Sequence, residues 1–216
     1  MLVSVIVPAF DAERYLRAAV ASILAQRHDP IEIIVVDDGS SDGTHALAES
    51  LGPPVRAISQ PNAGPGAARN RGVEAARGAW LAFLDADDLW VPGKIASQRA
   101  VLDDETAVFG HVQQFTEREG RAIDLGEPTC GHHVGTMLIA RRAFDRVGAF
   151  RTDLRLGEFV DWHLRATDAG IRMTTLPDVM LRRRVHGENF TLHMRPHSAD
   201  FARVLKEALD RRRGKV

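Results

Sequence analysis

The chain of 216 residues contains a single cysteine, Cys130. One cysteine cannot form an intramolecular disulfide or supply a cysteine-built zinc site, so neither can stabilise the fold. Nothing around Cys130 in the sequence would activate its thiol, and we expect it to be a small apolar filler. The length is sufficient for one domain with a substantial core.

Long apolar runs are also absent, since the longest, such as 3–7 and 31–36, have the length of strands. The beginning of the chain lacks the charged region and apolar core of a signal peptide. Basic and acidic residues nearly cancel, with a formal net charge of -1. We therefore expect no nucleic-acid partner, no transmembrane segment and a cytoplasmic location, either free or peripheral to the inner face of the membrane.

Strands and helices alternate along the first hundred residues. Apolar runs rich in β-branched residues predict strands at 2–7, 31–36, 55–59 and 80–84, with helices at 12–24, 44–52, 67–77 and 92–102. Further on, we expect strands at 107–115, 135–140, 171–176 and 179–183 and helices at 141–147, 157–170 and 199–209, while 121–131 is weakly patterned. This order predicts a single α/β domain whose mostly parallel sheet carries helices on both faces, with the strands' carboxyl ends on one edge.

Four polar clusters follow the first four predicted strands: 8–11, 37–42, 62–69 and 85–88. Ligands of open α/β sheets bind beyond the carboxyl ends of the strands. An acidic turn would account for Asp85-Ala86-Asp87-Asp88 alone, but four clusters in register favour one shared ligand site on this rim.

Five segments resemble family 2 glycosyltransferases of the GT-A fold: VSVIVPAFDAERYL (3–16), IIVVDDGSSDGT (33–44), NAGPGAARNRG (62–72), FLDADD (83–88) and GTMLIARRAFDRVGAF (135–150). The resemblance implies an inverting transfer of one sugar per event from a nucleotide-diphosphate sugar, with Mn²⁺ or Mg²⁺. The acceptor could be a glycan, a lipid-linked molecule, a peptide or a small molecule. Within a GT-A domain at 1–198, residues 1–103 would bind the nucleotide sugar and 104–198 the acceptor, followed by a C-terminal helix and solvated basic tail at 199–216.

The resemblance also gives the acids different roles. Asp87 would bind the metal that bridges the donor's two phosphates, and Asp85, with Ala86 beside it, would hold the ribose or assist the metal. Asp88 would either cap the next helix, which we favour, or bind the metal. Asp38, more than its neighbour Asp37, would contact the nucleoside base.

The first rim loop contributes Pro8, Ala9 and Phe10 to nucleotide binding in this resemblance. Phe10 stands where tyrosine is more usual, a change that keeps base stacking and loses a hydroxyl contact. Asp11 would either cap the following helix, which we favour, or contact the nucleotide.

The third rim loop contributes Gly64 and Arg69. Gly64 would permit close approach of the backbone to the donor, or simply make the turn. Arg69 lies near a helix N-terminus and would bind the diphosphate or nucleotide, the alternative being a surface arginine.

An inverting transfer needs a general base near the acceptor. In the resembling family it comes from a Glu-Asp pair, but here the matching residues are Glu158 and Phe159. We assign the base to Glu158, with Asp161 as the alternative, one of the two being an N-terminal helix acid. The altered pair also leaves open a second interpretation, a catalytically weak or inactive module that binds a sugar nucleotide or a protein partner.

The segment from Arg184 to Asn189, RVHGEN, resembles the Arg-x-His-x-x-Asn ending of many family members. His186 would complete the metal shell or contact phosphate, or else act as a structural hydrogen bonder. The Gln-x-x-Arg-Trp pattern of processive synthases is absent, which argues against a polymer-extruding enzyme.

Overall fold

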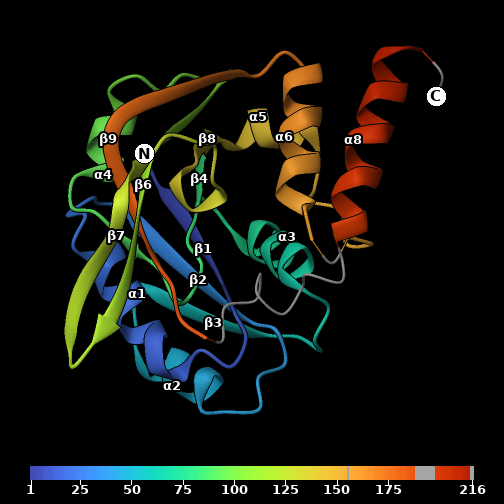
Figure 1. Cartoon of the computed structure of the whole chain (residues 1–216). Helices are drawn as coiled ribbons and strands as arrows, with labels where there is room; N and C mark the ends of the chain where they lie inside the picture. The colour runs from blue at the N-terminus through green and yellow to red at the C-terminus, as the bar shows by residue number, and fades with distance from the viewer. Residues whose placement is uncertain (155, 188–197, 215–216) are drawn as a thin grey trace.

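The computed structural model describes residues 1–154, 156–187 and 198–214. Its centre is a mixed nine-stranded sheet (Figure 1). The strands lie in the order β3 (Val55–Ser59), β2 (Ile31–Asp37), β1 (Val3–Ala9), β4 (Trp80–Phe83), β8 (Leu138–Ala140), β6 (Thr106–Arg118), β9 (Arg172–Arg184) and β5 (Leu89–Trp90), with β7 (Arg121–Thr129) paired to β6. No helix in these described parts is long and apolar enough to cross a membrane.

The first half of the chain follows the predicted alternation. Its elements are β1 (Val3–Ala9), α1 (Glu13–Leu24), β2 (Ile31–Asp37), α2 (Thr44–Ser50), β3 (Val55–Ser59), α3 (Pro65–Ala75) and β4 (Trp80–Phe83). β1 pairs in parallel with β2 and β4, and β2 with β3. The predicted parallel sheet is confirmed for these strands, and their carboxyl ends share one edge.

The second half departs from the prediction. It contains β5 (Leu89–Trp90), α4 (Lys94–Arg99), β6 (Thr106–Arg118), β7 (Arg121–Thr129), the 3-10 turn η1 (Val134–Thr136), β8 (Leu138–Ala140), α5 (Arg141–Val147), α6 (Glu158–Asp168), β9 (Arg172–Arg184) and α8 (Ser198–Arg212). β8 runs antiparallel to both β4 and β6, so not every strand ends on one edge. The two strands expected at 171–176 and 179–183 are one long strand, β9.

β7 shows why its stretch looked weakly patterned. All nine of its residues are exposed, so no face is buried and no alternation of apolar and polar residues is required. Cys130, just after β7, is exposed as well. The expectation that it fills space in the core is therefore wrong.

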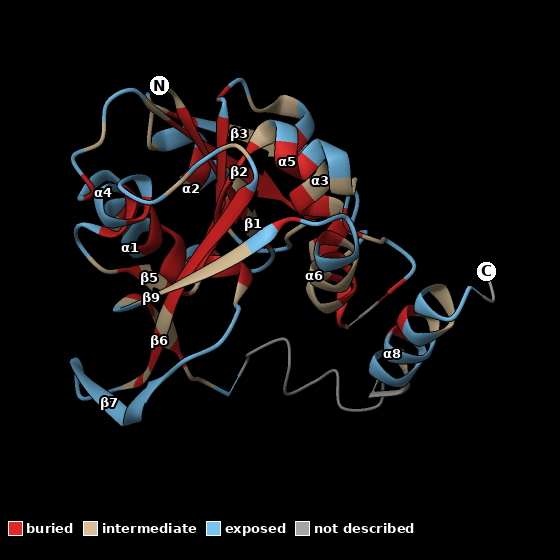
Figure 2. Cartoon of the chain, turned by 90° about the horizontal axis from the view of Figure 1, so that it is seen from above, coloured by how far each residue is buried: buried red, intermediate tan, exposed pale blue. Residues whose placement is uncertain are grey.

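The core lies on both sides of the sheet, where the central strands are buried along their length (Figure 2). On one side, Phe83 of β4 packs against Phe144 and Phe150, and both of these contact the fully buried Trp162 of α6. These rings fix α5 and α6 against the sheet, and α6 begins with the proposed base, Glu158.

Gly72 lets α3 pack closely against β1, since a Cβ atom there would lie 2.4 Å from Cγ2 of Ile6. We expect Gly72→Ala to destabilise the protein by about 1–3 kcal/mol, because Ile6 is a fully buried β-branched residue that cannot move aside. Urea unfolding measures the change. The control is Gly131→Ala, where nothing lies within 4 Å of the added Cβ; equal stability of the two variants would contradict the packing argument.

Candidate functional site

The loops after β1, β2, β3 and β4 meet at the common edge of the sheet. Asp38, in the loop after β2, binds the loop after β3. Its Oδ1 accepts from Gln60 Nε2 (2.7 Å) and from the Ala63 N–H (2.9 Å), and its Oδ2 accepts from the Gly64 N–H (2.8 Å). Gly64 has φ 90°, in the region that favours glycine. A carboxylate offers roughly four acceptor positions, so Asp38 shapes this loop and retains capacity for a ligand N–H.

Asp11 does not cap α1, contrary to the interpretation we favoured. It adopts φ 45°, and its Oδ1 accepts from the Ser41 N–H at 2.7 Å. The first N–H groups of the α1 region are instead bound from the second loop, with Ala12 N–H donating to Thr44 Oγ1 (2.8 Å) and Glu13 N–H to Asp42 Oδ2 (3.1 Å). The side chains of Thr44 and Asp42 therefore cap the start of α1, and these bonds hold the loops after β1 and β2 together.

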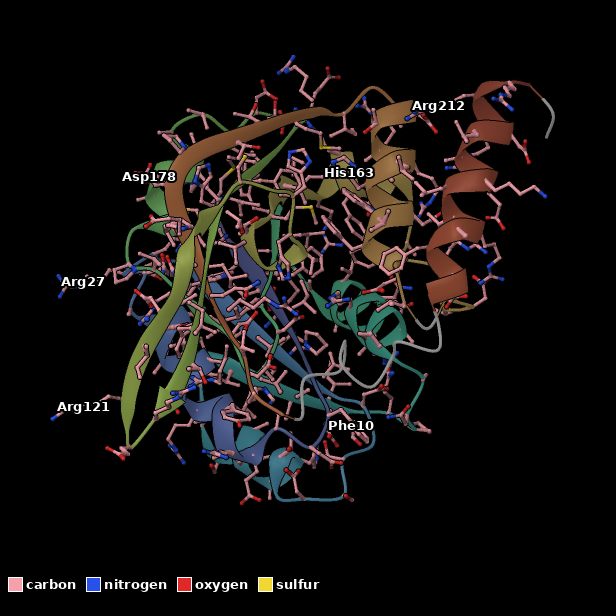
Figure 3. All side chains as sticks on the ribbon, viewed as in Figure 1. Phe10, Arg27, Arg121, His163, Asp178 and Arg212 are labelled. Atoms are coloured by element: carbon pink, nitrogen blue, oxygen red, sulfur yellow. The ribbon has the colours of Figure 1, made fainter. Side chains whose placement is uncertain are left out.

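Pro8 and Ala9 form the last two residues of β1, so Pro8 lies within the strand that it was expected to end. The Ala9 carbonyl accepts from the Asp38 N–H at 2.8 Å. Phe10 follows with its side chain 52% exposed, and Figure 3 shows it at the molecular surface. Of these three residues, Phe10 has the exposed side chain that base stacking requires.

Arg69 lies between two carboxylates. Its Nη1 donates to Glu158 Oε1 (2.6 Å) and its Nη2 to Asp85 Oδ1 (2.7 Å). Burial alone would raise the pKa of Asp85, but the adjacent guanidinium outweighs it and lowers that pKa below its usual range. With only 4% of Arg69 exposed, the geometry favours positioning of these two acids over direct contact with a donor.

Glu158 and Asp161 have different surroundings, although both lie in the first turn of α6. Glu158 reaches the rim through Arg69, and Gly66 permits this approach because a Cβ there would lie 2.8 Å from the Arg151 carbonyl oxygen. Asp161 is fully buried, with its Oδ2 bound by Arg165 Nε at 2.7 Å. Glu158 is therefore the better placed of the two for contact with an acceptor.

Asp87 and His186 come together from positions 99 residues apart, with Asp87 Oδ2 and His186 Nε2 separated by 3.0 Å. The His186 ring also packs on Tyr15, with ring centroids 4.8 Å apart. The remainder of the RVHGEN pattern, Glu188 and Asn189, lies outside the described residues.

A divalent cation is compatible with Asp87 and His186, since a carboxylate oxygen and an imidazole nitrogen are suitable ligands for Mn²⁺. In the described ranges, no group of three or more His, Cys, Asp or Glu side chains is arranged to hold a metal ion. The remaining ligands would have to come from water and from substrate phosphate, which is how Mg²⁺ is commonly bound in phosphate-transferring sites.

A cavity of about 290 Å³ opens beside His186, and its lining includes Arg14, Tyr15, Glu117 and Arg184. Arg184 forms an ion pair with Glu117 and donates from Nε to the Asp87 backbone carbonyl (2.9 Å). The cavity is therefore lined by His186, the residue that meets Asp87, and by Arg184, which contacts the Asp87 backbone.

Asp88 caps no helix, so the interpretation we favoured is wrong; α4 begins later, after Gly93. The Asp88 carboxylate is buried, and its Oδ1 accepts from the Arg184 N–H at 2.8 Å. Burial, together with the carboxylates of Asp87 and Asp85, raises the pKa of Asp88 well above its usual range. The partner of the Asp88 carboxylate is thus a backbone N–H of β9, 96 residues further along the chain, and not the N-terminus of the next helix.

We expect Asp88→Ala to destabilise the fold by about 1–3 kcal/mol, since the buried Arg184 N–H would lose its acceptor. Asp88→Asn keeps an oxygen at the same place and should cost clearly less. Urea unfolding of the two variants measures the difference, and equal losses of stability would show that the hydrogen bond is not the cause.

His133 lies near Asp85 and Asp87, although no pattern in the sequence distinguished it from the other histidines. Its Nδ1 accepts from the Gly135 N–H at 3.0 Å, which leaves the proton of the neutral ring on Nε2. Burial lowers the pKa of His133, while the charge of nearby Asp85 opposes the shift. The ring is thus a fixed N–H donor close to the acids, and no motif in the sequence marked it because its partner is a backbone group.

The mixed central sheet with its flanking helices has the architecture of the GT-A fold class. The chain belongs to glycosyl transferase family 2, whose model matches residues 4–152.

Curated relatives agree with this family, and a solved structure shares the fold. An uncharacterised glycosyltransferase of Rickettsia prowazekii is 40% identical over 213 residues, covering 88% of this chain and 66% of the relative. One from Nostoc sp. is 46% identical over 99 residues, covering 44% of this chain and 31% of the relative. S. aureus TarS in complex with UDP has a TM-score of 0.70 at 22% identity, covering 98% of this chain and 71% of that chain. The chain thus spans less than the full length of each.

Proposed function

We propose that this chain transfers one sugar per event, with inversion, from a nucleoside-diphosphate sugar to an acceptor, using Mn²⁺ or Mg²⁺. The observation that carries the proposal is the convergence of Asp85, Asp87, His186, Arg69 and Glu158 at the carboxyl end of β4. This arrangement offers a cation site facing the donor and a carboxylate facing the acceptor. S. aureus TarS has been solved with UDP and with UDP-GlcNAc, which supports uridine nucleotides as the first donors to assay.

The donor would lie across the four rim loops. Phe10 offers an exposed ring for stacking on the base, and Asp38 offers a carboxylate to a base N–H. Asp87 and His186 would hold the cation, which supplies Lewis-acid stabilisation to the departing diphosphate. The neutral Nε2–H of His133 provides a further donor near the acids.

Glu158 would take the proton from the acceptor hydroxyl. Arg69 holds its Oε1, which fixes the carboxylate and directs Oε2 to the proton transfer. Asp85 shares the same guanidinium, so Arg69 couples the donor side to the acceptor side. We place this activity in the cytoplasm, with the protein either free or peripheral to the inner face of the membrane.

A second function is a module that binds a sugar nucleotide or a protein partner without turnover. The observation that favours it is Phe159, which packs against Trp162 and Phe109 where a carboxylate would serve as base, while the neighbouring Glu158 is bound to Arg69.

A panel of nucleoside-diphosphate sugars, assayed for binding, hydrolysis and transfer with Mn²⁺, Mg²⁺ or EDTA, distinguishes the two functions. Metal-dependent binding with turnover supports the enzyme. Metal-dependent binding without turnover, across donors and acceptors of each class, supports the module. Absence of binding by any donor would overturn both.

A further inference from the structure

The first turn of α8 packs on the segment that leads into α6, beside which α8 lies (Figure 1). The Leu156 N–H donates to Asp200 Oδ2 at 3.3 Å. The Phe201 ring comes within 3.3 Å of the place where a Cβ atom of Gly157 would lie. Two residues at the start of α8 therefore contact the two residues that directly precede Glu158.

The middle of α8 is joined to the same region through Arg151. The Arg151 guanidinium pairs with Glu207 of α8, and its Nη1 lies 3.7 Å from Oδ1 of Asp161 in the first turn of α6. This Asp161 oxygen is buried and has no hydrogen-bond partner among the described residues, so Arg151 is one of the cations that balance its charge. Arg151 thus connects α8 to the helical turn that carries Glu158.

The backbone of Arg151 contacts α3. A Cβ atom at Gly66 of α3 would lie 2.8 Å from the Arg151 carbonyl oxygen and 3.4 Å from Cγ of Glu158. Asn70 of α3 binds the preceding residue twice, because its Oδ1 accepts from the Phe150 N–H (2.9 Å) and its Nδ2 donates to the Phe150 carbonyl (2.8 Å). The segment before α6 is therefore held by both α3 and α8.

The last turn of α8 contacts the end of α6 that is remote from Glu158. Asp168, the last residue of α6, pairs with Arg211 (3.6 Å) and with Arg212 (2.8 Å). These pairs correct the expectation of a solvated tail, since the helix continues to Arg212. They also give α8 a second attachment, which can be removed without touching the residues before Glu158.

We propose that α8 positions the general base, with Asp200 and Phe201 as the positioning residues. They fix the two residues before α6, and the place of the first turn of α6 decides whether Glu158 Oε1 meets Arg69 Nη1, as it does at 2.6 Å. A reacting group held about 1 Å out of place can lose a hundredfold in rate. The inference rests on the proposed function, because it takes Glu158 as the group that receives the acceptor's proton.

Hydrogen exchange of the full chain tests the positioning without any turnover. The Asp161 N–H donates to the Gly157 carbonyl at 2.9 Å, so its exchange rate reports the first turn of α6. Phe201→Ala and Asp200→Ala should each raise that rate by about tenfold or more. The matched control is Asp168→Ala, which releases the other end of α8 and should leave the rate unchanged. The proposal is overturned if the Phe201 variant exchanges like the parent, or if the control exchanges as fast as the Phe201 variant.

Kinetics of sugar transfer separate positioning from a general loss of stability. Phe201→Ala should lower kcat by about tenfold or more and leave the KM for the donor nearly unchanged. Phe201→Tyr keeps a ring against Gly157 and should restore kcat. In a Glu158→Gln background, Phe201→Ala should have little further effect, because the carboxylate through which it acts is already gone. Thermal unfolding checks that the variants remain folded.

The kinetic outcomes distinguish this proposal from the proposed function. Loss of kcat in Glu158→Gln but not in Phe201→Ala would overturn the role of α8 and leave the base in place. A loss in Phe201→Ala that adds in full to that of Glu158→Gln would also overturn it, since the helix would then act elsewhere. Full activity of Glu158→Gln would overturn the base assignment itself, and the positioning of that base with it.

Discussion

Replacing Asp87 by alanine is expected to reduce metal-dependent transfer by about a thousandfold or more. The reason is the loss of the carboxylate that, with His186, would hold the cation opposite the diphosphate; Lewis-acid stabilisation of a departing group is worth several kcal/mol, and each 1.4 kcal/mol is about tenfold in rate. Donor binding should become weak and insensitive to EDTA. Calorimetric titration of the donor with and without Mn²⁺, together with kcat/KM, measures both effects.

The matched control is Asp178→Ala, which removes an exposed carboxylate from β9 (Figure 3). It should leave metal dependence and kcat/KM unchanged. If Asp87→Ala bound the donor with the same metal dependence as the parent, the assignment of Asp87 to the metal would be wrong.

Replacing Glu158 by glutamine is expected to lower kcat by about 10²- to 10⁴-fold, the usual contribution of a general base. The amide oxygen can still accept from Arg69, and Arg69 keeps its bond to Asp85, so the site should stay assembled. Donor affinity should therefore change little. Pre-steady-state transfer and donor titration separate the chemical step from binding.

Asp161→Asn is the control for this prediction. Asp161 is fully buried against Arg165, so its replacement should lower the Tm and leave kcat nearly unchanged. Full activity of Glu158→Gln, with kcat lost in Asp161→Asn, would move the base to Asp161 and contradict the geometric assignment.

Most of the first half of the fold could be predicted from local pattern. The mostly apolar runs that became β1, β2 and β4 arise because these strands are buried on both faces, and that signal lies within each segment. The second half was harder, since β7 has no buried face and β8 is a short antiparallel insertion between two strands. Whether a strand runs parallel or antiparallel to its neighbours, and which strands it pairs with, produces no periodic pattern of apolar residues in the sequence.

The misassigned residues share one cause. Asp11 and Asp88 were assigned to helix caps because such caps are local, but each accepts a hydrogen bond from a residue far along the chain, Ser41 and Arg184 respectively. The assignment of Arg69 to the donor stays a prediction, and the structure adds two partners, Asp85 and Glu158, that lie 16 and 89 residues away along the chain. A hydrogen-bond partner that lies far along the chain cannot be inferred from the residues around the acid.

The sequence by itself determined the family, the alternation of the first half and the four polar clusters on one rim, since each depends on residues close together in the chain. Only the tertiary structure decided that Arg69 joins Asp85 to Glu158 and that Asp87 meets His186. These depend on which distant segments become neighbours in the sheet and against α6. That choice is made by packing of the whole core, and no single segment encodes it.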